Sequence, residues 1–172
     1  MNTRTSKLII TGGFGLSLLA TVIQAFSYKM MMHGPHLIMT AINLLSLLGS
    51  LAIIGGFGLL FLSERDIIDL GIAGALGLSF LLSLIGILGA LQIWIVSAAF
   101  LAWAYQLWTK NQMLGIAVAG TVVLNIVIQY VFPSLLLNVL ALPQSAYIVT
   151  IYLFAIAINL VRIYAAYSDI NQ

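Results

Sequence analysis

Residues 70–109 form a stretch of forty residues that contains no charged side chain. An α-helix needs about 20 apolar residues to cross the roughly 30 Å of hydrocarbon in a bilayer. The stretch is therefore too long for one crossing and long enough for two, with a turn near residues 86–92. Further apolar runs fill most of the remaining chain, so lipid is predicted to surround nearly the whole protein.

The composition excludes most other classes of protein. Of the 172 residues, 63% are hydrophobic and only 6% are charged, whereas a soluble domain carries about 25% charged residues. A soluble enzyme and a disordered tail are therefore excluded. Without clustered Lys and Arg, no nucleic acid is expected as a partner. The absence of cysteine excludes disulfides, iron–sulfur clusters and thiolate zinc sites.

The sequence predicts an all-α, polytopic integral membrane protein. Six transmembrane helices with short loops are expected to form a compact bundle and a single domain over 1–172. The predicted spans cover residues 8–27, 37–62, 70–87, 91–108, 113–132 and 146–164. The segment 134–142 is too short to cross the membrane, and both an interfacial and a re-entrant path stay open for it.

The basic residues predict how these spans are oriented. Cytoplasmic loops carry an excess of Lys and Arg. With six spans, Arg4, Lys7, Arg65, Lys110 and Arg162 fall on one side, and Lys29 falls alone on the other. We therefore expect both termini in the cytoplasm and the cell membrane as the location. The side chain of Arg162 is expected to snorkel to the cytoplasmic interface.

Aromatic residues near the ends of the fourth span agree with this topology. One end carries Trp94, and the other carries Trp103, Tyr105 and Trp108. Trp and Tyr are enriched at membrane interfaces, so these four side chains are expected to form interfacial belts.

Glycines predict where helices approach each other closely. The sequence Gly-Gly-Phe-Gly-Leu occurs at residues 12–16 and again at 55–59. Small residues let helix backbones come together in lipid, so the repeat predicts a tight contact between the first and second spans. Gly71, Gly74 and Gly77 lie close to one face of the third span and also predict close packing.

Polar side chains recur every three or four residues along three spans, so each set lies on one side of its helix. The sets are Ser17, Thr21, Gln24 and Tyr28; Thr40, Asn43, Ser46 and Ser50; and Thr121, Asn125 and Gln129. Four amides, Gln24, Asn43, Asn125 and Gln129, fall in the predicted outer half. They indicate interhelical hydrogen bonds worth on the order of 0.6 kcal/mol each, and the alternative is a polar cavity open to the outside.

Ionisable residues inside a membrane are costly and usually mark proton or ion pathways. None is predicted near the middle of a span, which argues against a proton pump and against a carboxylate-based ion-coupled transporter. Ser63 is expected to cap the third helix, with Asp66 completing a capping box. Asp69 is expected to be a charge cap in the first turn, paired with Arg65.

The predicted outer loop, residues 28–36, is rich in methionine and histidine. Thioether and imidazole ligands suit copper, so Met32, His33 and His36 are candidate metal ligands; a plain interfacial loop turning at residues 34–35 is the alternative. Two histidines in one loop cannot ligate haem from opposite helices. This chain by itself is therefore not expected to bind a cofactor. Copper or haem bound jointly by this chain and another subunit stays open as an alternative.

These observations favour a non-catalytic subunit that packs in and stabilises a larger membrane complex, with other membrane subunits and lipid as its partners. No enzyme activity is expected, because no nucleophile has a base in reach. The alternative is a small channel, carrier or binding subunit for a neutral or weakly polar solute. That solute would occupy a polar cavity in the outer half of the bundle.

Overall fold

The computed structural model describes residues 2–31, 36–86, 89–133, 135 and 143–170, which form six long α-helices with short connections. They are α1 (Thr3–Met31), α2 (His36–Glu64), α3 (Ile67–Leu84), α4 (Ala90–Lys110), α5 (Gln112–Tyr130) and α6 (Gln144–Ile170). All six are long and apolar enough to cross a membrane. The all-α fold and six helices long and apolar enough to be the predicted spans are thus confirmed. The predicted turn before α4 is confirmed too, and Gly86 there takes a φ of 76°.

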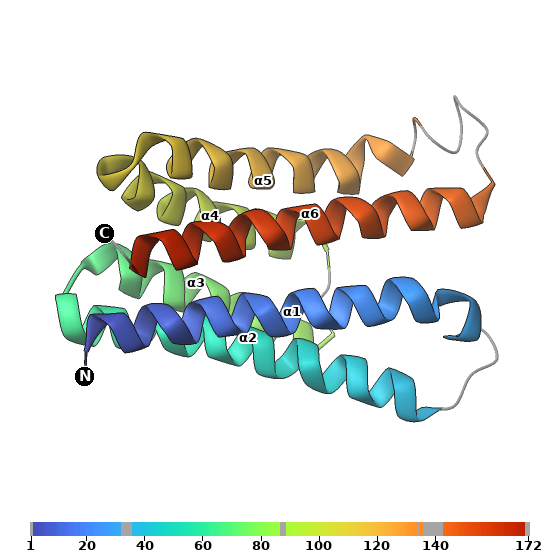
Figure 1. Cartoon of the computed structure of the whole chain (residues 1–172), viewed down its shortest axis with the longest axis horizontal. Coiled ribbons are helices and arrows are strands. Elements are labelled where there is room, and N and C mark those ends of the chain that lie inside the picture. The colour runs from blue at the N-terminus through green and yellow to red at the C-terminus, as the bar shows by residue number, and fades with distance from the viewer. Residues whose placement is uncertain (1, 32–35, 87–88, 134, 136–142, 171–172) are drawn as a thin grey trace.

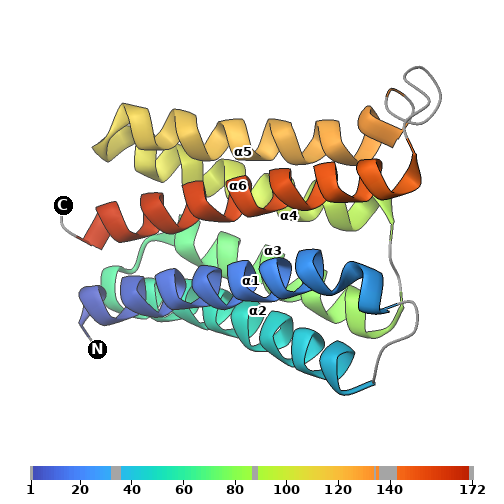
Figure 2. The same ribbon diagram turned by 45° about the vertical axis from the view of Figure 1, so that its right-hand side comes forward.

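The six helices form a closed ring. Each helix packs against the next one in the chain, and α6 returns to pack against α1. Figures 1 and 2 show α1 and α2 on one side, α4 and α5 on the other, and α3 and α6 between them. The start of α1 and the end of α6 lie at the same end of the bundle (Figure 1), which we call the terminal end.

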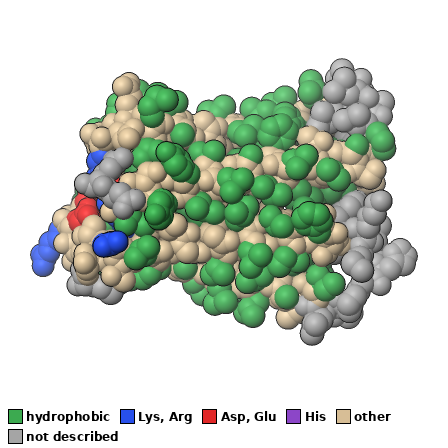
Figure 3. Space-filling model, viewed as in Figure 1, with side chains coloured by type: hydrophobic (Ala, Val, Ile, Leu, Met, Phe, Trp, Pro, Cys, Tyr) green, Lys and Arg blue, Asp and Glu red, His purple; other side chains and the backbone are tan. Residues whose placement is uncertain are grey.

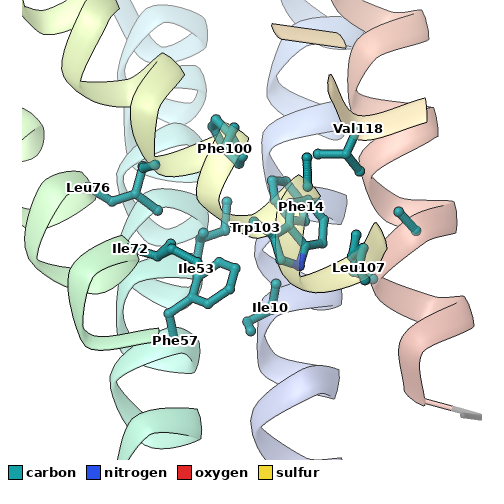
Figure 4. Close-up of a cluster of buried hydrophobic side chains, with 14 of the residues drawn as sticks. Ile10, Phe14, Ile53, Phe57, Ile72, Leu76, Phe100, Trp103, Leu107 and Val118 are labelled. Carbon is teal, nitrogen blue, oxygen red and sulfur yellow. The ribbon is translucent and has the colours of Figure 1, made fainter. Parts of the chain in front are cut away.

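Aromatic side chains fill the ring interior in the half nearer the terminal end. Trp103 of α4 stacks on Phe14 of α1, with ring centroids 5.4 Å apart. It also meets the ring of Phe57 of α2 edge-on, at 5.9 Å. Figure 4 shows these residues within the buried cluster, to which all six helices contribute. Burial of this cluster joins helices that are distant in sequence.

The position of Trp103 differs from its prediction. Its side chain is only 4% exposed, because residues 100, 103, 104 and 107 form the inward face of α4. The prediction of an interfacial belt is therefore wrong for Trp103. The other three predicted belt residues, Trp94, Tyr105 and Trp108, are exposed.

Glycines bring the backbones of α1 and α2 into contact. A Cβ atom added to Gly13 would lie 2.8 Å from the Gly49 carbonyl oxygen, and one added to Gly49 would lie 2.9 Å from the Gly13 carbonyl oxygen. A Cβ atom on Gly56 would collide with Ile10. The predicted tight contact between the first two spans is confirmed, and the repeated sequence supplies Gly13 and Gly56 to it.

The glycines of α3 do not pack as predicted. A Cβ atom on Gly71 or Gly74 would meet no atom within 4 Å, and one on Gly77 would meet only the Ile54 side chain, at 3.9 Å. Gly71 and Gly74 face outward, while Ile72 on the opposite side of the helix is fully buried. The predicted close packing at these glycines is therefore wrong within this chain.

The link between α2 and α3 also differs from its prediction. α2 continues through Ser63 to Glu64, and Arg65 takes a positive φ of 57°. The Asp66 carboxylate then accepts a hydrogen bond of 2.9 Å from the backbone N–H of Ile68. Asp66 is thus the N-cap of α3, a position that favours Asp. The predicted cap by Ser63 is wrong because Ser63 still belongs to α2.

The surface divides into two regions. Figure 3 shows hydrophobic side chains spread along the flank of the bundle and charged side chains gathered at the terminal end. Large apolar residues such as Leu81, Leu153 and Val123 are about half exposed or more along the flank. Contact with the hydrocarbon of a bilayer stabilises such a flank, whereas contact with water would not.

Candidate functional site

Arg162 of α6 points into the ring. Its guanidinium carbon lies 3.8 Å from the centroid of the Phe100 ring. Its Nε donates a hydrogen bond of 3.2 Å to the hydroxyl oxygen of Thr121. Phe100 is the middle residue of α4, and Thr121 is the middle residue of α5. The positive charge is therefore held inside the bundle, halfway along it.

This geometry overturns two predictions. Arg162 does not snorkel to the interface, and an ionisable side chain does lie near the middle of the bundle. The reason is the length of α6, which continues past Arg162 to Ile170, whereas the predicted span ends at residue 164. The spacing contained the signal, because Ile158, Arg162 and Asp169 share one helical face, and Ile158 and Asp169 are both buried.

An ion-pair group closes the terminal end. The Asp169 carboxylate of α6 accepts from Lys7 of α1 at 3.0 Å and from Lys110 of α4 at 3.3 Å. Lys7 also donates to the backbone carbonyl oxygen of Asp169 at 2.7 Å. Only 9% of the Asp169 side chain is exposed. One buried carboxylate thus joins α6 to α1 and also to α4, which lies across the ring.

Gln106 of α4 holds two further carboxylates at the same end. Its side-chain nitrogen donates to Asp66 Oδ2 and to Asp69 Oδ1, each at 3.0 Å. Asp69 lies in the first turn of α3, as predicted, but its described hydrogen bond is to Gln106 and not to Arg65. One side-chain amide of α4 therefore donates hydrogen bonds to two carboxylates at the start of α3.

These two groups line a cavity of about 80 Å³. Its charged lining residues are Lys7, Lys110, Glu64, Asp66, Asp69 and Asp169. The chain contains four acidic residues in total, and all four line this one cavity. The acidic residues are thus concentrated at the terminal end, away from the guanidinium of Arg162.

A larger cavity of about 240 Å³ lies between α2, α3 and α4, and we call it the serine cavity. Its polar groups come from Ser50, Ser79, Ser83 and Gln92. Its apolar walls come from Ile53, Ile54, Leu76, Phe80, Val96 and Phe100. It extends from Phe100, halfway along the bundle, toward the end opposite the termini. None of the described residues that line it is charged.

The four predicted amides do not line either of these cavities. Asn43 and Gln129 are exposed, and Gln24 and Asn125 are half-buried. A cavity built from these amides stays a prediction. Other members of the same polar stripes do reach the interior: Ser50 lines the serine cavity, and Thr121 contacts Arg162.

The predicted metal ligands fall largely outside the described residues. Met32 and His33 are not described, and of His36 only the backbone, at the start of α2, is described. Within the described part of the chain, no group of three or more His, Cys, Asp or Glu side chains is placed to hold a metal ion. Most of the segment 134–142, predicted to be interfacial or re-entrant, also lies outside the described residues.

Polar residues of α3 and α4 were not predicted to have a role, yet they supply most polar groups of the serine cavity. Ser79 and Ser83 are four residues apart, which places them on one face of α3. The Gln92 side-chain nitrogen reaches across from α4 to the Ser79 carbonyl oxygen, at 3.5 Å. The spacing of the two serines is the signal that could have identified them.

The chain matches no protein-family model, no curated protein and no solved structure. Its function is therefore inferred from the geometry of Arg162, of the charged terminal end and of the serine cavity. Of these, the serine cavity has the volume to hold a molecule larger than a few waters.

Proposed function

We propose that this chain is a small integral membrane protein that binds a neutral or weakly polar solute in the serine cavity, as a channel, carrier or binding subunit. The cavity itself carries this proposal. Its volume of about 240 Å³ is far larger than the roughly 10–15 Å³ that a cavity needs to hold one water molecule. A space of this size suits a small solute rather than a drug-sized ligand.

The chemistry of the lining supports an uncharged solute. Three hydroxyls and one amide can donate and accept hydrogen bonds, and six apolar side chains form the rest of the wall. The Ser50 hydroxyl donates to the Ser46 carbonyl oxygen at 2.9 Å, so its oxygen is left to accept from a ligand. The described lining offers an ion no opposite charge, and a buried ion without one is unfavourable.

We further propose that the bundle lies in the cell membrane with its terminal end in the cytoplasm. Lys and Arg are in excess on the cytoplasmic side of membrane proteins. Arg4 and Lys7 at the start of α1, Arg65 between α2 and α3, and Lys110 at the end of α4 all belong to the terminal end. The serine cavity then lies in the half of the bundle nearer the outside.

A swelling assay tests the solute proposal. Liposomes containing the purified protein are exposed to a gradient of glycerol, urea or propanediol, and light scattering reports the entry of each solute. We expect at least one of them to enter several times faster than into protein-free liposomes. The Ser50→Leu variant, which places an isobutyl group in the cavity, is expected to abolish the increase.

Ser46→Leu is the matched control, because Ser46 lies one turn earlier on α2 and is exposed on the flank. It adds the same side chain outside the cavity and is expected to keep the wild-type rate. A binding subunit that does not conduct would instead show thermal stabilisation by the solute, sensitive to Ser50→Leu alone. Wild-type protein that neither admits nor is stabilised by any of the solutes contradicts the proposal.

A non-catalytic subunit of a larger membrane complex is the second candidate, and the outward face of α3 favours it. Gly71 and Gly74 leave open space on that face, which would let a helix of another protein approach closely. Extraction from the native membrane in mild detergent, followed by native-gel sizing and mass spectrometry, tests this candidate. Stoichiometric partner chains would support it, and a protein that migrates alone would contradict it.

A further inference from the structure

α4 lines both the serine cavity and the charged cavity at the terminal end, which we call the terminal cavity. Lys110, in the lining of the terminal cavity, is eighteen residues beyond Gln92, in the lining of the serine cavity. This separation is about 27 Å along the helix axis, and the hydrocarbon of a bilayer is about 30 Å thick. Together the two cavities therefore extend over nearly the thickness of a membrane. Their α4 residues are, in order, Gln92, Val96 and Phe100, then Trp103, Gln106, Leu107, Thr109 and Lys110.

The two cavities also share α2 and α3. On α2, Ile53 and Ile54 border the serine cavity, and Phe57, about one turn later, borders the terminal cavity. On α3, Leu76 borders the serine cavity, and Asp69, two turns earlier, borders the terminal cavity. The two cavities therefore lie one after the other along the same three helices, α2, α3 and α4.

Exposed lining residues show that the cavities reach the surface at opposite ends of the bundle. Ser83 borders the serine cavity and is exposed in the last turn of α3. Glu64 and Thr109 border the terminal cavity and are exposed at the ends of α2 and α4. α3 begins where α2 ends, so the last turn of α3 is at the end opposite Glu64. Each cavity is thus accessible from a different end of the bundle.

Buried apolar side chains separate the two cavities. Phe100 borders the serine cavity, and Trp103, about 4.5 Å further along α4, borders the terminal cavity. The centroids of these two rings are 6.2 Å apart. Ile72 of α3 is fully buried and lines neither cavity. We call this group the central layer, and its members are Ile53, Phe57, Ile72, Leu76, Phe100 and Trp103 (Figure 4).

We infer that the serine cavity and the terminal cavity are the two halves of one path for the solute, and that the central layer closes this path. The inference rests on the proposed function and deepens it, because it makes the protein a channel or carrier. Apolar constrictions close membrane pores by excluding water. Beyond the layer, Gln106 and Thr109 supply hydrogen-bonding groups to a solute that has left the serines.

Two truncations of equal size test the central layer. Ile72→Ala and Leu114→Ala both reduce a four-carbon side chain to a methyl group, and Leu114 is a buried residue of α5 that lines neither cavity. In the swelling assay, Ile72→Ala is expected to raise the rate of solute entry several-fold over the wild type. Leu114→Ala is expected to keep the wild-type rate. Ile72→Val, a milder change in the fold, is expected to give a rate between those of the wild type and Ile72→Ala.

Cysteine labelling tests the path without a solute. A small, membrane-impermeant thiosulfonate reagent is added on the side of the membrane at which Ser145→Cys reacts. Val96→Cys, in the serine cavity, is expected to react, and Leu60→Cys, in the terminal cavity, is not. With Ile72→Ala added, Leu60→Cys is expected to react from that side. With Leu114→Ala added, it is expected to stay unreactive.

The outcomes separate this inference from the proposed function. Leu60→Cys that stays unreactive with Ile72→Ala, or reacts equally with Leu114→Ala, overturns the path. If the wild-type protein admits a solute, an unchanged rate in Ile72→Ala overturns it too. Solute stabilisation that Ser50→Leu removes would still support binding in the serine cavity. If no solute enters or stabilises the protein, the proposed function fails, whereas labelling of Leu60→Cys through the truncated layer still supports a path.

Discussion

The guanidinium carbon of Arg162 lies 3.8 Å from the centroid of the Phe100 ring, at the middle of α4. A cation held on an aromatic face is stabilised by the ring quadrupole, by about 2 kcal/mol when both groups are removed from water. This contact replaces part of the hydration that the guanidinium loses inside the bundle. Phe100 therefore has a role that another apolar residue of similar size cannot take.

Phe100→Leu is expected to destabilise the protein by about 2 to 4 kcal/mol, because it removes both ring packing and the cation–π contact. The measurement is thermal or denaturant unfolding of the purified protein in detergent. Phe26→Leu is the matched control, since Phe26 is 84% exposed and is expected to change stability by less than about 0.5 kcal/mol. Equal effects of the two substitutions would show that Phe100 does not support Arg162.

Gly13→Ala is expected to destabilise the protein by about 1 to 3 kcal/mol, because the added methyl group must displace a backbone. Its Cβ would lie 2.8 Å from the Gly49 carbonyl oxygen and 2.9 Å from the Ile53 nitrogen. Gly12→Ala is the control, because a Cβ atom there meets nothing within 4 Å. Alanine also favours a helix over glycine by up to about 1 kcal/mol, so Gly12→Ala should be neutral or stabilising. A reversed order in unfolding experiments would contradict the contact between α1 and α2.

Asp169→Asn is expected to cost about 1.5 to 3 kcal/mol, because it removes the charged acceptor shared by Lys7 and Lys110. This expected loss of stability is kept low because the Lys110 side chain is 44% exposed and can be hydrated by water instead. Glu64→Gln makes the same change of charge at the same end, on an exposed residue for which the structure shows no ion pair. A double-mutant cycle of Asp169→Asn with Lys7→Gln should show a coupling that Glu64→Gln with Lys7→Gln lacks.

Cysteine labelling tests the orientation in the membrane. The chain has no cysteine, so one introduced cysteine is the sole target for a membrane-impermeant maleimide. Ser145→Cys, exposed at the start of α6, is expected to react in intact cells. Thr5→Cys, exposed in the first turn of α1, is expected to react only after permeabilisation. The opposite pattern would place the terminal end outside the cell.

Hydropathy and charge spacing were sufficient to predict the six spans, since each span depends on the composition of some twenty residues. The turn after α3 followed from the length of the uncharged stretch. The contact between α1 and α2 followed from small residues, although Gly49 was not singled out. Such features are local in the sequence, and no knowledge of the partner helices is needed to find them.

The direction in which a side chain points was harder to predict. Trp103 and Arg162 both lie near the ends of predicted spans, where an aromatic belt and snorkelling are the usual outcomes. Each instead shares the buried face of its helix, Trp103 with Phe100 and Leu107, and Arg162 with Ile158. The position of a residue along its helix can be predicted from the sequence. Which face of the helix is buried depends on the neighbouring helices, and the closed ring determines those neighbours.

The contact of α6 with α1 also sets the order in which the protein can be assembled. α6 is synthesised after the other five helices. Until α6 enters the membrane, these five helices form an open arc whose inward-facing side chains contact lipid. Inserting an arginine into a bilayer by itself costs about 2.5 to 3.5 kcal/mol at the centre of a helix. Arg162 belongs to the helix that closes the arc, and Thr121 and Phe100 are already in the membrane when it enters. Arg162 therefore enters the bundle after Thr121 and Phe100, the two groups that it contacts.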